Sequence, residues 1–351
     1  APGKDAPPEA PAIAADRARL TALASELDGA IKAAELTWVR ARQLIERITV
    51  LRHSIFTRNL LERLPSPLLP GLWRDLRSET PAVGRRLHYL ADDWWYWGNG
   101  KKLGLSALIA AALVLFIGLR LFVAHLTHYR KVQREASPPT FFERAISVAW
   151  TAPLRALPAA AAALLLFGGL DSLDLLYPPW GRAAAAMLKA VLVLASITAL
   201  ISAVLAPAER QWRFVDLADR AARRVVWLLY GITAVYAIDV ALTEISRAFF
   251  VPLALSVVQS FAASTAFAAL LIGLLLTPFE PQGASASGTV SRHTPRWFKI
   301  PLWLIALGIL AAALLGYVAL ARFVSQQLVL TGIVVVIGCL GYLAIRAVTR
   351  E

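Results

Sequence analysis

The chain has 351 residues, of which 58% are hydrophobic, whereas a soluble globular domain has about 45–50%. The excess lies almost entirely after Lys102, so a charged first hundred residues precede a strongly apolar remainder. The net charge of +13 does not indicate nucleic-acid binding, because the basic residues occupy short loops between apolar runs and form no stripe with stacking aromatics. We therefore predict an all-α membrane protein with an aqueous helical head.

The chain begins Ala1-Pro2-Gly3, which is typical of a processed end, and we expect a cleaved signal peptide to precede it. Residues 1–12 contain four prolines and several small residues, and they are predicted to form a flexible lead. The single cysteine, Cys339, excludes an intrachain disulfide.

Residues 13–100 are predicted to form a periplasmic α-helical head. A first helix is expected from Ile13 to Arg58, because apolar residues recur there at steps of three and four. This stripe comprises Leu20, Ala24, Leu27, Ile31, Ala34, Trp38, Ala41, Ile45 and Ile48. It is compatible with a helix in a small bundle or with a coiled coil between subunits.

Proline is expected to end this helical region, since Pro65, Pro67 and Pro70 follow closely. A short element at Leu72–Arg77 and a third helix from Pro81 to Trp95 are predicted next. Four aromatic residues then precede the first apolar run, namely Trp94, Trp95, Tyr96 and Trp97. We interpret them as a membrane-interface belt, with an aromatic ligand cage as the alternative.

Residues 101–351 are predicted to form a transmembrane region, because about 20 apolar residues in a helix cross the hydrocarbon core. The seven predicted spans are Leu103–Leu126, Leu154–Leu170, Ala183–Leu205, Val225–Leu242, Leu253–Leu276, Pro301–Leu320 and Phe323–Ile345. An amphipathic piece around Phe141 and Trp150 precedes the second span. It is expected either to lie along the membrane surface or to form the first turns of a longer, kinked span.

Loop charges predict the orientation, because cytoplasmic loops are rich in Lys and Arg. With the head outside, the cytoplasmic segments carry Arg130, Lys131, Arg134, Arg144, Arg210, Arg213, Arg220, Arg223, Arg224, Arg292, Arg296, Lys299, Arg346 and Arg350. The outer loops after the first span carry only Arg182, Arg247 and Arg322. We expect Arg130, Lys131, Arg213, Arg220, Arg223 and Arg224 to meet lipid headgroups, and we expect the last residues to be cytoplasmic.

Few charges are expected within the spans. Arg120 and Arg155 lie near inner ends, and Lys189 lies near an outer end, where it could reach the headgroups or line a polar path. No Asp or Glu is expected near the middle of a span. Ion-coupled transporters usually carry such a residue, so this expectation argues against active transport.

Motifs for an enzyme, a cofactor or a metal are not recognised in the sequence. His125 and His128 share a predicted helix face, but no carboxylate or thiol accompanies them. Asp171 and Asp174 are three residues apart in a short outer loop, which we interpret as a polar loop rather than a cation site. We expect no enzymatic activity, no cofactor and no metal site.

A family resemblance rests on the head stretch Arg42–Leu76. It resembles the N-terminal domain of unknown function found on large members of the MscS mechanosensitive channel superfamily. The matching residues are Arg52, Phe56, Thr57, Arg58, Ser66, Pro67, Leu68 and Trp73. The stretches Trp212–Asp219 and Gly316–Gly332 are also similar to the extra-helix region of such channels.

The resemblance implies a role in osmotic protection, as the peripheral tension-sensing and lipid-contacting region of a bacterial inner-membrane channel. It also implies assembly into a homo-oligomeric ring, typically a heptamer, around a pore that this chain does not contain. The superfamily's pore helix and β-rich domain find no counterpart before Glu351, so no pore residue is assigned. Two alternatives stay open: a non-conducting scaffold or assembly protein, and a permease component of a transporter.

Overall fold

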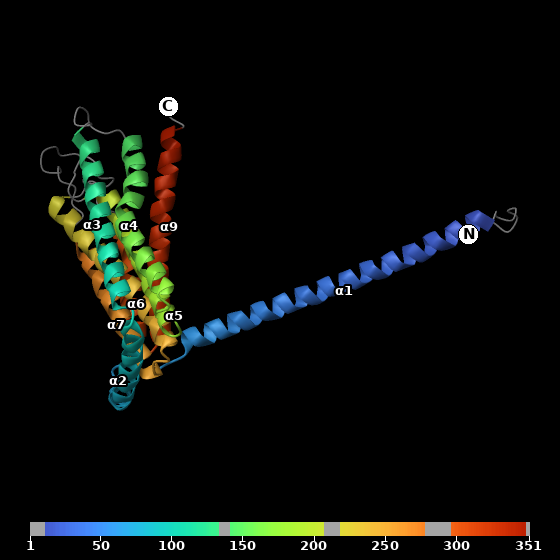
Figure 1. Cartoon of the computed structure of the whole chain (residues 1–351), viewed down its shortest axis with the longest axis horizontal. Coiled ribbons are helices and arrows are strands. Elements are labelled where there is room, and N and C mark those ends of the chain that lie inside the picture. The colour runs from blue at the N-terminus through green and yellow to red at the C-terminus, as the bar shows by residue number, and fades with distance from the viewer. Residues whose placement is uncertain (1–10, 133–140, 207–217, 278–295, 349–351) are drawn as a thin grey trace. The chain divides into compact units, whose positions relative to one another are not determined.

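A computed structural model describes residues 11–132, 141–206, 218–277 and 296–348 (Figure 1). The described part of the chain is all-helical, as predicted. Its helices are α1 (Pro11–Leu61), α2 (Pro70–Asn99), α3 (Lys102–Val132), α4 (Phe141–Ser172), α5 (Trp180–Leu205), α6 (Asp219–Ala248), α7 (Leu253–Leu276), α8 (Arg296–Leu314) and α9 (Val318–Val348).

The chain divides into two compact units, residues 1–60 and 61–351. The first unit consists of α1, whose 51 residues include the predicted helix Ile13–Arg58. The apolar stripe, with Leu27, Trp38 and Ile45 among its members, is exposed along this helix. The predicted small bundle is therefore not formed within the described residues of this unit.

In the second unit, a single helix, α2, replaces the two elements predicted at Leu72–Arg77 and Pro81–Trp95. Pro81 lies inside α2, where a proline costs about 3 kcal/mol because it removes a hydrogen bond and crowds the preceding turn. Contacts on both sides of Pro81 offset this cost. Leu72 is buried against Val257 and Val318 on one side, and Leu90 packs beside Phe249 on the other.

Within the described residues, six helices are long and apolar enough to span a membrane, and they are α3, α4, α5, α6, α7 and α9. The apolar part of α8, Lys299–Leu314, is shorter than these six. The second predicted span and the piece before it form one continuous helix, α4, which contains Pro153 and Pro158. The continuous helix favours the alternative in which that piece forms the first turns of a longer helix.

The sixth predicted span ends earlier than the sequence suggested, at Leu314 rather than Leu320. The turn that ends α8 is a Schellman motif: Tyr317 N donates to Ala312 O at 2.9 Å, and Gly316 N donates to Ala313 O at 3.4 Å. Gly316 adopts φ +95°, a left-handed conformation that glycine accepts readily. As a consequence α9 begins at Val318, and Arg322 lies inside this helix rather than in an outer loop.

The turns that end α4 and α6 have the same hydrogen-bond pattern. After α4, Leu175 N donates to Leu170 O at 3.0 Å, and Asp174 has φ 52°. After α6, Val251 N donates to Ser246 O at 2.9 Å, and Phe250 has φ 51°. These three Schellman turns satisfy carbonyl groups that otherwise lack partners where an apolar helix ends.

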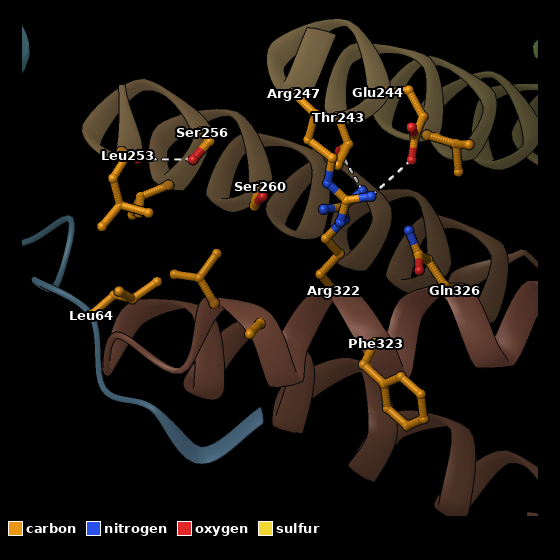
Figure 2. Close-up of a pocket in the computed structure, with 14 residues that line it drawn as sticks. Leu64, Thr243, Glu244, Arg247, Leu253, Ser256, Ser260, Arg322, Phe323 and Gln326 are labelled. Atoms are coloured by element: carbon orange, nitrogen blue, oxygen red, sulfur yellow. Dashed lines mark hydrogen bonds and ion pairs between the residues drawn. The ribbon is translucent and has the colours of Figure 1, made fainter. Parts of the chain in front are cut away.

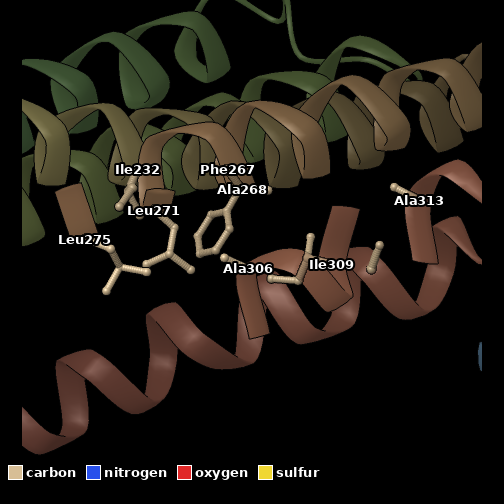
Figure 3. Close-up of a cluster of buried hydrophobic side chains, with 9 residues drawn as sticks. Ile232, Phe267, Ala268, Leu271, Leu275, Ala306, Ile309 and Ala313 are labelled. Carbon is tan, nitrogen blue, oxygen red and sulfur yellow. The ribbon is translucent and has the colours of Figure 1, made fainter. Parts of the chain in front are cut away.

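A buried apolar cluster lies between α6, α7, α8 and α9, and Figure 3 shows most of its side chains. Phe267 and Leu271 of α7 pack with Ile309 of α8 in this cluster. The alanines Ala268, Ala306, Ala313 and Ala321 are almost fully buried within it. Small side chains let neighbouring helices approach closely in lipid, where van der Waals packing is a main source of attraction.

Gly316 lies close to Leu64 in the linker between α1 and α2. A substitution at Gly316 therefore tests the role of this turn. A Cβ atom at Gly316 would lie 2.4 Å from Leu64 O, and left-handed backbone is unfavourable for alanine. We expect Gly316→Ala to lower the free energy of unfolding by about 1–3 kcal/mol, measured by thermal unfolding in nanodiscs. Gly308→Ala is the matched control, because nothing lies within 4 Å of its added Cβ. Equal midpoints for the two variants would contradict this account of the turn.

Candidate functional site

Helix α2 lies at one end of the bundle of membrane helices (Figure 1). At the α8–α9 turn, Leu64 N donates to Gly316 O at 3.1 Å and Ser66 Oγ donates to Leu314 O at 2.6 Å. These residues of the linker place the start of α2 against the last helix pair. We call the segment from Leu64 to Lys101 the strap, because it goes on to contact the other two turns.

The middle of the strap contacts the α6–α7 turn. The guanidinium of Arg86 lies 5.8 Å from the centre of the Phe250 ring, within cation–π range. Leu90 packs beside Phe249 and Trp180 in an apolar cluster. The aromatic ring of Trp180 stands edge-on to Phe249 with ring centres 5.2 Å apart, so this cluster also joins α5 to the same turn.

The end of the strap contacts the α4–α5 turn. Trp94 Nε1 donates to Leu175 O at 3.3 Å, and its ring lies 5.8 Å from that of Trp180. Tyr177 Oη donates to Asp93 Oδ2 at 3.0 Å. Burial and this hydrogen bond to a carboxylate raise the pKa of Tyr177 above its ordinary value. Lys101 Nζ bonds Leu173 O just before α3 begins.

Polar residues form a second feature at the same end of the bundle (Figure 2). Asp239 of α6 is only 4% exposed, and its Oδ2 accepts from Arg322 Nε of α9 at 2.7 Å. Arg322 Nη2 also bonds Thr243 Oγ1, and Gln326 Nε2 donates to Asp239 Oδ2 at 3.2 Å. The Asp239–Arg322 pair therefore joins α6 to α9 within their apolar segments.

No acidic residue is expected from the sequence near the middle of a span, and Asp239 lies inside α6 but nearer to its C-terminal end. The predicted span ended at Leu242, but α6 continues to Ala248, which places Asp239 nine residues (248 − 239) from the helix end. Hydropathy alone ends the predicted span before Glu244 and Arg247. Those side chains pair with each other at 2.9 Å, and the helix continues through them.

Two cavities adjoin the pair. The larger has a volume of about 410 Å³ and lies between the last turns of α6 and the first turns of α7 and α9. The smaller, of about 10 Å³, is the size of one water molecule and is lined by Asp239 and Ser264 among others. Asp239 Oδ1 and Ser264 Oγ are buried without a hydrogen-bond partner within the described ranges.

The residues of the predicted aromatic belt separate into two groups. Trp95, Tyr96 and Trp97 are exposed on α2, and their role as an interface belt stays a prediction. Trp94 is instead held against the α4–α5 turn by its hydrogen bond and its ring contact. Sequence reasoning grouped it with its neighbours because helical phase alone does not tell which ring faces a loop.

The basic residues predicted to meet headgroups lie at the opposite end of the bundle wherever the structure describes them. Arg220, Arg223 and Arg224 are exposed in the first turns of α6. The side chains of Arg130 and Lys131, and the whole of Arg213, lie outside the described residues. Within α4, Arg155 Nη1 donates to Ser202 O of α5 at 3.0 Å. Headgroup contact by the six predicted residues therefore stays a prediction.

The described ranges contain no group of three or more His, Cys, Asp or Glu residues placed to hold a metal. His125 is exposed on α3, and the side chain of His128 lies outside the described residues. The expectations of no cofactor and no enzymatic activity are untested by this geometry. The arrangement offers instead a helix-end strap and a polar cluster beside a pocket.

The contribution of the Asp239–Arg322 pair to the stability of the protein can be tested by substitution. Removing one partner leaves a buried charge uncompensated, so we expect Asp239→Leu to lower the free energy of unfolding by about 3–5 kcal/mol. The double variant Asp239→Leu with Arg322→Leu should recover much of this loss, because neither charge is then left alone. Thermal unfolding in nanodiscs measures both. Glu244→Gln is the control, since its partner Arg247 is exposed and such pairs contribute about 0–1 kcal/mol. A double variant as unstable as the sum of its single variants would contradict the coupling.

Comparisons with known proteins give one match, which covers residues 31–93 and is to a family described as "Protein of unknown function (DUF3772)". This region contains much of α1, the linker and most of α2. No curated protein and no solved structure matches the chain. The match confirms that part of the resemblance that assigned the head to a domain of unknown function. The chain is thus a multi-pass helical membrane protein with an N-terminal DUF3772 domain.

Proposed function

We propose that this chain is the peripheral, lipid-contacting and tension-sensing region of an MscS-like mechanosensitive channel in a bacterial inner membrane. In this proposal the strap faces the periplasm, and copies of the chain surround, as a homo-oligomeric ring, a pore formed by residues beyond this chain. Ions pass through that pore, the function is osmotic protection, and the chain itself has no enzymatic activity. The DUF3772 match overlaps the stretch Arg42–Leu76 that carries the channel resemblance, which supports the proposal.

The observation that carries the proposal is the large apolar surface that the spans leave uncovered. In the most apolar part of α3, α4, α5 and α9, 11%, 6%, 11% and 11% of residues are buried, against 39% in α6. On α3, for example, Val114 is 70% exposed and Leu121 is 65% exposed. Membrane tension does work on a protein by changing its in-plane area, so helices with a long lipid-facing perimeter are suited to receive that work.

The strap supplies a route by which such work is shared between helices. It contacts the turns after α4, α6 and α8, and it leads directly into α3. A displacement of one helix pair in the membrane plane is therefore opposed by contacts at the other two. Because rigid elements with packed contacts transmit displacement, we infer that the strap makes the peripheral helices respond together.

Orientation is tested by labelling cysteines from one side of the membrane. In a Cys339→Ser background, we expect Tyr96→Cys on the strap to react with an impermeant maleimide added to intact spheroplasts. Ser291→Cys, which lies outside the described residues, should react only after the membrane is opened, because the basic segments face the cytoplasm. Labelling of Ser291→Cys in intact spheroplasts would overturn this orientation.

Channel function is tested by pressure-clamp recordings on giant spheroplasts that express the full-length protein. We expect pressure-activated currents, and a raised threshold in the double variant Leu90→Ala with Trp94→Ala, because the strap no longer couples the helix pairs. Tyr96→Ala is the matched control on the same helix, since this side chain is 78% exposed. Its threshold should equal that of the wild type.

Three outcomes would count against the proposal. If the strap variant left the pressure threshold unchanged, the strap would have no role in tension sensing. The absence of any pressure-activated current would favour a scaffold, for which the exposed stripe of α1 offers a surface. Solute uptake that depends on Asp239 and not on pressure would favour a permease component, which the buried Asp239–Arg322 pair makes a specific alternative.

A further inference from the structure

The larger pocket beside Arg322 opens between α6, α7 and α9 at the end of the bundle that carries the strap (Figure 2). Its volume of about 410 Å³ lies in the range of small-molecule sites. Its wall is partly apolar, with Leu253, Val257 and Phe323, and partly polar, with Thr243, Arg247 and Arg322. A pocket of mixed polarity at the end of a membrane helix bundle fits an amphiphilic ligand.

Arginine supplies positive charge from two of the three helices. Arg322 is 21% exposed, and Asp239 and Thr243 engage its Nε and Nη2. Its Nη1 donates no hydrogen bond within the described ranges, so this donor remains for a ligand. Arg247 is 70% exposed and bonds only Glu244 through Nη1 among the contacts described. An arginine with an uncommitted donor beside an open pocket is suited to a phosphate oxygen.

The N-terminal ends of two helices add to the positive electrostatic potential in the pocket. The first turns of both α7 and α9 line the pocket, through Leu253 and Val318. Pro252, at the N-cap of α7, makes no side-chain capping bond, so no side chain caps the amide groups of the first turn. Helix N-termini carry partial positive charge and bind anions. Negative charge comes from Glu244 and from the last turn of α6, which meets the opposite wall of the pocket.

We propose that this pocket binds the headgroup of a zwitterionic phospholipid, with the phosphate held by Arg322, Arg247 and the N-terminus of α7. The ammonium group of a phosphoethanolamine then lies near Glu244 and the carbonyl end of α6. The acyl chains follow the apolar wall of Leu253, Val257 and Phe323 into the bilayer. This inference rests on the membrane location of the chain and not on channel activity, so either proposal can fail without the other.

The test uses the full chain in detergent and measures retention of dioleoyl-phosphatidylethanolamine by native mass spectrometry during a lipid titration. We expect one lipid to bind saturably to the wild type. Arg247→Gln should weaken binding about tenfold, the loss expected for one charge-assisted hydrogen bond. Ser260→Phe should abolish it by filling the pocket, while the sequence at Asp239 and Arg322 stays unchanged. Arg182→Gln, an exposed arginine of α5 at the same membrane end, should bind as the wild type does.

Further measurements distinguish lost binding from lost folding, and a lipid phosphate from a free phosphate. Thermal midpoints of Arg247→Gln and Ser260→Phe should stay close to that of the wild type, which shows that lost binding is not lost folding. Dioleoylglycerol, which has no phosphate, should bind at least tenfold more weakly. Equal binding of dioleoylglycerol, or unchanged lipid affinity in folded Ser260→Phe, would overturn the proposal. Binding of inorganic phosphate without binding of the lipid would replace the lipid by a free anion and overturn it as well.

Discussion

The helix-ending turns after α4, α6 and α8 are the constraint on which the membrane part of this chain depends. Each is a Schellman turn, and each satisfies carbonyl groups of an apolar helix with the chain's own amides. The turns are therefore compact, and the strap can pack directly on them. Leu64 bonds the third turn, Leu90 packs on the second, and Trp94 bonds the first. A 30-residue helix is about 45 Å long, long enough to cross several helices of a bundle.

The position of the third turn also determines where the buried charges meet. Because Gly316 ends α8, α9 begins at Val318, and Arg322 falls four residues (322 − 318) inside a helix rather than in a loop. At that depth it meets Asp239, which belongs to a helix that continues past the predicted end of its span. A charge inside an apolar segment is costly unless it is paired. The start of α9 and the end of α6 therefore depend on each other. If only one of these helices extended this far, its charged residue would be buried without a partner.

The sequence predicted those elements that depend on patterns among neighbouring residues. It did not predict the features that depend on contacts between residues far apart in the chain. The long helix α1 and the apolar spans follow from periodicity and hydropathy, which are properties of neighbouring residues. Pro81 predicted a helix boundary, but contacts of Leu72 and Leu90 on either side of it hold one continuous helix. Asp239 and Arg322 lie 83 residues apart, and no local pattern relates them. Gly316 was the one signal present in the sequence, but the apolar residues around it concealed the turn.

Leu64 connects the strap to the pocket at the same end of the bundle. Its amide bonds Gly316, and it also lines the pocket that contains Arg322. A lipid headgroup in that pocket would therefore contact the first residue of the strap and the first turns of α7 and α9. In the proposed channel, lipid occupancy and strap position then act on the same turn, so tension that draws the lipid outward also pulls on the strap contact. A ligand shifts a conformational equilibrium only by its difference in affinity between the two states. In this proposal the pocket meets that requirement, because its walls belong to three helices and a separation of those helices would change its shape.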